Sequence, residues 1–144
     1  MGHFRNIIVC EDVREELGNK KSLMGVFGGD IVVLEFPVTL QLAFYIEYVP
    51  DSSDTNTEIS FEFRMLMDDQ ELVKGKAVFQ TSPPGNVAGI TLPKGLANFD
   101  KECRFRLLVT EAGKSEIELV SKRILRGLTV SSDTVTQRRA GSGS

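Results

Sequence analysis

Hydrophobic and polar residues alternate with a period of two along much of this 144-residue chain. The clearest stretch is residues 57–67, TEISFEFRMLM, in which every second residue from Ile59 to Met67 is apolar. Residues 39–49, TLQLAFYIEYV, repeat the pattern directly after Pro37. Because successive side chains of a β-strand point to opposite faces, both stretches predict strands with one face in a core.

Similar stretches follow, separated by residues that favour turns. The sequence DDQE at 68–71 and AGK at 112–114 predict the turns of hairpins, and SPPGN at 82–86 predicts a loop. The strands expected around them cover residues 72–80, about 87–92, 100–110 and 115–126. In the last of these the apolar phase slips between Leu119 and Ile124, which predicts a β-bulge. Eight or nine strands with little or no helix predict an all-β fold, an antiparallel β-sandwich.

The N-terminal segment predicts a long hairpin. Ile7, Val9 and Val13 fall on one side of an extended chain, whereas residues 11–17 lack the apolar stripe of an amphipathic helix. Gly18-Asn19 offers the positive φ angles that tight corners require. We therefore expect residues 11–17 to pair with residues 20–27. A helix over residues 11–17 is the alternative.

The same segment carries a resemblance. The run CEDVR at 10–14, then GNK at 18–20 and SLMGVF at 22–27, is similar to the opening of an uncharacterised family of small bacterial and phage proteins. Members of that family open with Cys-Asp/Glu-Asp-Val-Arg and continue with Gly-Lys-Leu-Ser-Leu-Ile-Gly-Val. The resemblance extends loosely to about residue 125, and Asn19 and the doubled Lys20-Lys21 depart from it. It implies a β-sandwich without a known activity.

Composition and charge limit the class of protein. Apolar residues make up 41% of the chain, enough for one globular domain, which we place at residues 1–130. Residues 131–144, ending in AGSGS, are expected to be a flexible tail. Residues 1–120 are acidic, with 12 basic and 19 acidic side chains, so a nucleic acid is an improbable partner. The arginines after position 120 are interpreted as part of a solvated end that an anionic partner could contact: Arg123, Arg126, Arg138 and Arg139.

Cysteine usage and hydropathy predict a cytoplasmic protein. Cys10 and Cys103 lie in apolar runs 93 positions apart, which is typical of buried thiols in a reducing compartment. The longest apolar run near the N-terminus is residues 7–10, too short for a signal peptide, and we expect no membrane span.

Catalytic chemistry finds little support in the sequence. The single histidine, His3, lies near the N-terminus, and neither cysteine is close to a group that would activate it. The glycines of GVFGGD at 25–30 precede a strand-like run rather than a helix, so they predict a bulge or sharp corner instead of a phosphate loop. We expect no enzyme activity and no cofactor. Calcium is the one metal that the sequence leaves open, through loop carboxylates at Asp51, Asp54, Asp68, Asp69 and Glu71.

Two functions remain, both of them forms of binding. The first is a non-catalytic interaction module for another protein or for a second copy of itself, because exposed sheet edges pair readily. The second is a binder of a small ligand, nucleotide-like or another metabolite, with a pocket at one end of the sandwich. A role in conflict between phage and host is conceivable for either, given the resemblance. The candidate contact residues are Gly28, Gly29, Asp30, Pro83, Pro84, Gly85, Asn86, Arg104 and Arg106.

Overall fold

The computed structural model describes residues 2–18, 20–51, 58–80 and 87–127, which form ten strands and no helix. No helix in these residues is long and apolar enough to cross a membrane. The predicted tail at 131–144 and the loop at 82–86 lie outside the described residues. The strands are β1 (His3–Cys10), β2 (Asp12–Glu16), β3 (Lys20–Met24), β4 (Ile31–Val33), β5 (Val38–Val49), β6 (Glu58–Met67), β7 (Gln70–Gln80), β8 (Ala88–Phe99), β9 (Cys103–Glu111) and β10 (Ile117–Arg126).

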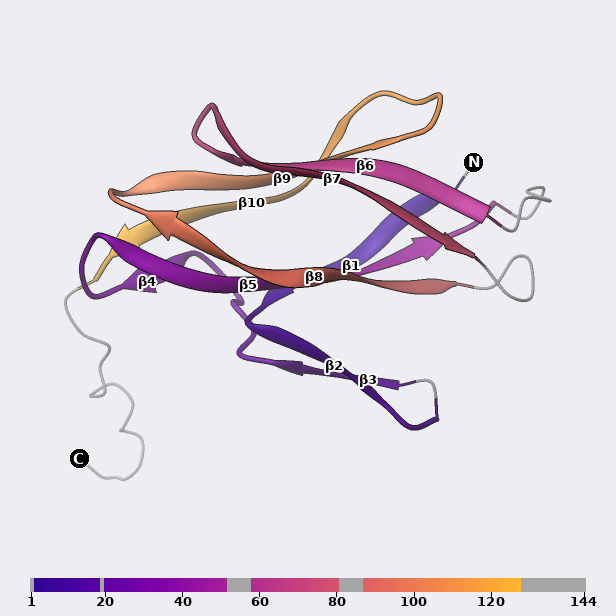
Figure 1. Ribbon diagram of the computed structural model, residues 1–144, viewed down its shortest axis with the longest axis horizontal. Helices are drawn as coiled ribbons and strands as arrows, with labels where there is room; N and C mark the ends of the chain where they lie inside the picture. The colour runs from indigo at the N-terminus through magenta and orange to yellow at the C-terminus, as the bar shows by residue number, and fades with distance from the viewer. Residues whose placement is uncertain (1, 19, 52–57, 81–86, 128–144) are drawn as a thin grey trace.

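Two sheets pack face to face, and a separate hairpin lies outside them (Figure 1). Sheet A has the order β1-β5-β8, and sheet C has the order β4-β10-β9-β6-β7. Neighbouring strands are antiparallel except β4 and β10, which are parallel. The hairpin of β2 and β3 stands on the face of sheet A that is turned away from sheet C. The predicted antiparallel β-sandwich is confirmed, with slightly more strands than expected.

The core lies between the two sheets and is rich in aromatic side chains. Phe44 of β5 stacks on Phe105 of β9, with ring centroids 6.0 Å apart and an interplanar angle of 13°. Phe99 of β8 meets the edge of Phe105 at 6.2 Å. The alternation in β5 and β9 is confirmed, because their predicted inward residues are largely buried. These buried residues are Leu42, Phe44, Ile46, Tyr48, Cys103, Phe105, Leu107 and Val109.

The predicted N-terminal hairpin forms, but it is shorter than expected. β2 pairs with β3 from Asp12↔Met24 to Glu16↔Lys20, and Gly18 adopts φ 83° in the turn. The chain bends at Glu11, so Ile7 and Val9 belong to β1, which pairs with β5 instead. The hairpin remains tied to the sandwich, since the N–H of Glu11 donates to Met24 O at 2.9 Å and the N–H of Phe27 donates to Val9 O at 2.9 Å.

Strand β8 is longer than the predicted 87–92, because it continues through Pro93 to Phe99. Proline lacks the N–H that a central strand needs, but β8 is the edge of sheet A. The register with β5 shifts between Leu42↔Gly95 and Phe44↔Leu92, which gives β8 one extra residue at this point. The predicted bulge in β10 is confirmed between Glu118 and Val120.

Phe61 tests the core assignment. Its side chain is 1% exposed and meets Phe4 at a ring distance of 5.3 Å, whereas Glu62 on the opposite face is exposed. Phe61→Ala is expected to lower the free energy of unfolding by about 3–5 kcal/mol, because it removes buried area and leaves a cavity. The control Glu62→Gln should change it by less than about 0.5 kcal/mol. Urea denaturation measures both, and equal losses would contradict the assignment.

Candidate functional site

The side of the sandwich between β1 and β10 is open. β1 is an edge of sheet A, and β10 has β4 beside it only at Ile124–Arg126. Over residues 117–122, which we call the free edge of β10, β9 is the only strand of the described residues that pairs with β10. Two hollows follow one another along this side. A hollow of about 590 Å³ reaches from Phe4 to Ile117, and one of about 340 Å³ is lined by Ile7–Val9, Val26–Gly28 and Leu119–Lys122.

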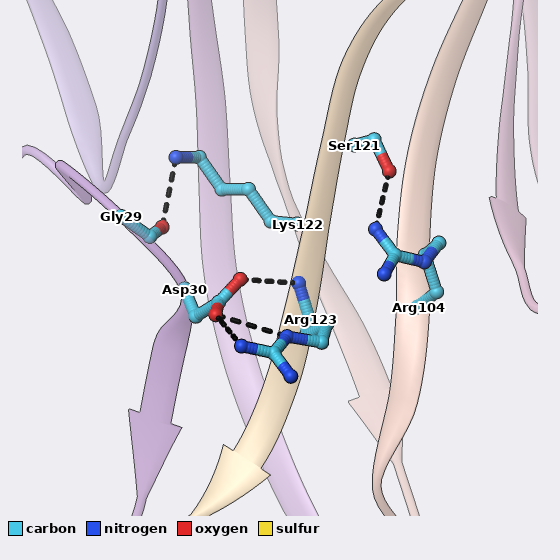
Figure 2. Close-up of polar contacts among 6 residues, drawn as sticks. All are labelled: Gly29, Asp30, Arg104, Ser121, Lys122 and Arg123. Carbon is cyan, nitrogen blue, oxygen red and sulfur yellow. Dashed lines mark hydrogen bonds and ion pairs between the residues drawn. The ribbon is translucent and has the colours of Figure 1, made fainter.

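The corner at Gly28–Asp30 closes one end of this side and is tied to β10 (Figure 2). Asp30 Oδ1 accepts the backbone N–H of Arg123 at 2.9 Å, and Asp30 Oδ2 accepts Nη2 and Nε of the same arginine at 2.7 and 3.0 Å. Lys122 Nζ donates to the carbonyl of Gly29 at 2.8 Å. Figure 2 shows both β10 side chains reaching toward the corner. Four hydrogen bonds thus hold the chain that leads into β4.

The two predicted corner glycines are not required by steric crowding. Neither Gly28 nor Gly29 has a positive φ, and a Cβ at either position would meet nothing within 4 Å. The glycine of this segment that needs its freedom is Gly25, with φ 67° and Glu11 close to where a Cβ would lie. The chain does pass from the hairpin to sheet C here, as the predicted corner required. The backbone at Gly28 and Gly29 is therefore left open on its outer side.

Arg123 sets the electrostatics of Asp30. The hydrogen bond from the Arg123 backbone N–H, followed by those from its side chain, lowers the pKa of the Asp30 carboxyl below its usual value. The charge of Arg104 contributes in the same direction. Asp30 is consequently ionised at neutral pH and committed to Arg123.

Arg104 and Arg106 lie on the neighbouring strand β9, on the face of sheet C that carries Ser121 and Arg123. Arg104 pairs with Arg123 in the ladder, and its Nη1 donates to Ser121 Oγ at 2.7 Å (Figure 2). Arg106 forms an ion pair with Glu118 at 2.7 Å. Gly29, Asp30 and Arg104 thus all contact side chains of residues 121–123 of β10. Arg106 lies farther along β9.

The remaining predicted contact residues come from the segment between β7 and β8. Pro83, Pro84, Gly85 and Asn86 lie outside the described residues. The strands that flank them, ending at Gln80 and starting at Ala88, pair with Glu58 and Tyr48, at the opposite end of the sandwich from Arg104 (Figure 1). Of the described members of the predicted set, Gly28 lines the hollow of about 340 Å³, and Asp30 and Arg104 are connected through Arg123 and Ser121 of β10.

Three residues of β10 were not among the predicted site residues: Ser121, Lys122 and Arg123. Arg123 and Arg126 are exposed to solvent, as expected, but they belong to β10, within the strand predicted at 115–126, and not to a free end of the chain. Arg123 binds Asp30, and the N–H of Arg126 donates to Glu102 Oε2 at 2.9 Å. Arg138 and Arg139 lie outside the described residues. The free edge was missed because a single sequence does not show which strand lies beside which.

A third hollow, of about 410 Å³, lies between the hairpin of β2 and β3 and sheet A. Lys20, Lys21 and Leu23 of β3 line it from one side, and Tyr45 and Glu47 of β5 from the other, together with Val87 and Gly89. The Tyr45 hydroxyl donates to Glu47 Oε2 at 2.9 Å, and Glu47 also accepts from Arg5 and Asn6. These hydrogen bonds from Asn6, Arg5 and Tyr45 lower the pKa of the Glu47 carboxyl. The hollow is therefore a polar cleft with two lysines on its rim.

The described residues contain no activated nucleophile and no cluster of metal-ligating side chains. Cys10 and Cys103 are free thiols, 0% and 9% exposed, and burial raises the pKa of both. Within the part of the chain that the structure describes, no group of three or more His, Cys, Asp or Glu side chains could hold a metal ion. Of the carboxylates considered for calcium, Asp54 lies outside this part.

Comparison with protein-family profiles and with curated proteins finds no match for this chain. The resemblance to a bacterial and phage family therefore stays a prediction.

The lowered pKa of Asp30 predicts a pH dependence. A carboxyl whose pKa is depressed by folding stabilises the native state above its unfolded pKa, and this contribution is lost as the pH falls through the folded value. Asp30→Asn is therefore expected to be less stable than the wild type at neutral pH, with the difference vanishing in acid. Urea midpoints measured from neutral pH into the acid range check this. A difference that stays constant across the range would contradict it.

Proposed function

We propose that this protein is a non-catalytic interaction module that binds an extended segment of another protein along the free edge of β10. The observation that carries the proposal is that this edge of β10, whose main-chain groups have no partner strand in the described residues, lies beside a hollow lined by both apolar and polar residues. Leu119 and Val120 face a groove whose other wall is formed by Ile7, Val9 and Phe27. A segment in extended conformation would add hydrogen bonds to β10 and place alternate side chains in the hollow.

Comparison of the edges favours β10. β7 exposes Lys74 and Lys76, and β8 contains Pro93 and a bulge with Lys94 exposed, devices that discourage strand pairing. β1 is interrupted by Asn6, which has φ 50° and lies in a register shift. β10 has a bulge as well, and its free edge contains one lysine, Lys122, but no proline. The other charge of the free edge, Glu118, is paired with Arg106.

The direction of one N–H makes the proposal testable. The N–H of Arg123 points away from β9, to Asp30. Because N–H groups alternate sides along a strand, the N–H and C=O of Ser121 point the same way, into the free edge. An added segment would pair with these groups.

Ser121→Pro is expected to block binding, because proline removes that N–H from an edge position. The matched control, Ser121→Ala, also loses the bond to Arg104 but keeps the N–H. Short peptides selected from a displayed random library against the wild type should bind Ser121→Ala with similar Kd and Ser121→Pro about tenfold more weakly. Fluorescence anisotropy measures Kd, and circular dichroism checks the fold of each variant.

Hydrogen exchange on the wild type gives an independent readout if Ser121→Pro does not fold. The amide of Ser121 should gain protection when a selected peptide binds. A library that yields no binders, or peptides that bind both variants equally without protecting Ser121, would overturn the proposal. A concentration-dependent dimer in sedimentation that Ser121→Pro abolishes would assign the edge to a second copy and overturn the assignment to another protein.

A second candidate function, binding of a small anionic ligand, is favoured by the polar cleft under the hairpin. Its volume of about 410 Å³ fits a metabolite, and Lys20 supplies positive charge, whereas Lys21 is paired with Glu15 at 2.6 Å. ATP and inorganic phosphate are the probes in a thermal-shift assay, with Lys20→Gln as the variant. A ligand at a hundred times its Kd stabilises by about 2.7 kcal/mol, so Tm should rise in the wild type and rise less in Lys20→Gln. A flat melt with both probes would remove this candidate.

The same proposal places the protein in the cytoplasm. Its support is the state of Cys10 and Cys103, which are buried, unpaired and far apart in sequence. The proposal includes the absence of enzyme activity. In support, charged side chains of β9, β10 and the corner form ion pairs with one another, such as Asp30 with Arg123 and Glu118 with Arg106.

A further inference from the structure

One cation on the open side has a neutral partner. Lys122 lines the hollow of about 340 Å³, and its Nζ donates to the carbonyl of Gly29 at 2.8 Å. The other charged residues lining the two hollows are Glu111 and Lys114, which pair with each other at 3.0 Å. In the described residues, Lys122 is therefore the charged side chain of these hollows that has no carboxylate opposite it.

Of the neighbouring cations on the outer face of sheet C, Arg104 also has a neutral partner, the hydroxyl of Ser121, whereas Arg106 and Arg123 bind carboxylates. Arg123 binds Asp30 at 2.7 Å, and Arg106 binds Glu118 at 2.7 Å. The side chain of Lys122 leaves β10 on the groove side, one residue after Ser121, whose N–H points into the free edge. The ammonium group thus lies where a segment paired with Ser121 would pass.

We infer that the segment bound along β10 carries a carboxylate that pairs with Lys122, either an acidic side chain or a C-terminus. This inference rests on the proposed function and names the chemistry of the partner. A lysine ammonium group has three N–H donors. Nζ can therefore donate one hydrogen bond to the Gly29 carbonyl and another to a carboxylate beside it. A residue directly opposite on an added strand has its Cβ about 4.5–5.5 Å away, within reach of the lysine side chain. An ionised acceptor forms a bond roughly twice as strong as a neutral one.

A double-mutant cycle tests the inference with the selected peptides. Lys122→Gln is expected to weaken their binding about 3- to 10-fold, while Lys122→Arg restores most of it. The control, Lys76→Gln, makes the same change of net charge at an exposed lysine on β7, whereas Lys122 is half-buried, and it should leave Kd unchanged. Replacing the acidic residue of the peptide by its amide should cost as much as Lys122→Gln. Both changes together should cost no more than either alone.

Two peptide arms distinguish the sources of the carboxylate. One arm carries a C-terminal amide and retains its acidic side chains; the other retains the free C-terminus and carries side-chain amides. Loss of coupling to Lys122 in one arm identifies the group. Peptides that depend on the Ser121 N–H but bind Lys122→Gln as tightly as the wild type would overturn this inference and leave the proposed function standing. Peptides that do not depend on the Ser121 N–H would overturn both.

Discussion

The stacking of Phe44 on Phe105 joins the central strands of two sheets of unequal width. The two rings lie 6.0 Å apart, one from β5 and one from β9. Sheet A offers three strands to a sheet C of five, and strands are spaced about 4.8 Å apart, so sheet A cannot cover sheet C completely. The hairpin does not add width, because β2 and β3 stand on the outer face of sheet A. The open sides of the sandwich follow from this mismatch.

The two open sides of the sandwich differ in the residues at their strand edges. On the side of β7 and β8, lysines and a proline occupy the exposed edges, although a small apolar hollow reaches Phe63 and Leu92 between them. On the side of β1 and β10, the corner at Gly28–Asp30 covers only the last part of β10. An exposed strand edge normally favours aggregation. A binding role for the edge of β10 would explain why it lacks a covering strand beside the groove. This asymmetry is the physical basis of the proposed interface.

Much of the fold could be predicted from the sequence, because the period of two is strong wherever one face of a strand enters the core. Residues such as Phe105 and Ile46 were assigned to the interior by alternation alone, and the bulge in β10 was visible as a slip of phase. The split at Glu11 was not visible, because β1 and β2 share one pattern yet pair with β5 and β3. The predicted β8 ends before Pro93 and is too short. Proline is excluded from central strands but tolerated at a sheet edge, and the sequence does not show which strands are edges.

The site was only partly predictable, for a related reason. Asp30 and Arg104 stood out as charged residues at a corner and on a strand, but their connection runs through Arg123 and Ser121, contributed by β10. A main-chain ladder along β10 would accept many sequences, since every residue except proline offers the same donor and acceptor. Selectivity must then come from side chains at fixed positions of the groove. In the proposed interface, Val9 and Phe27 would select for shape, and the ammonium group of Lys122, held by the Gly29 carbonyl, would select for charge. Gly28 and Gly29 add no side chain at this end of the groove, and a Cβ at either position would meet nothing within 4 Å.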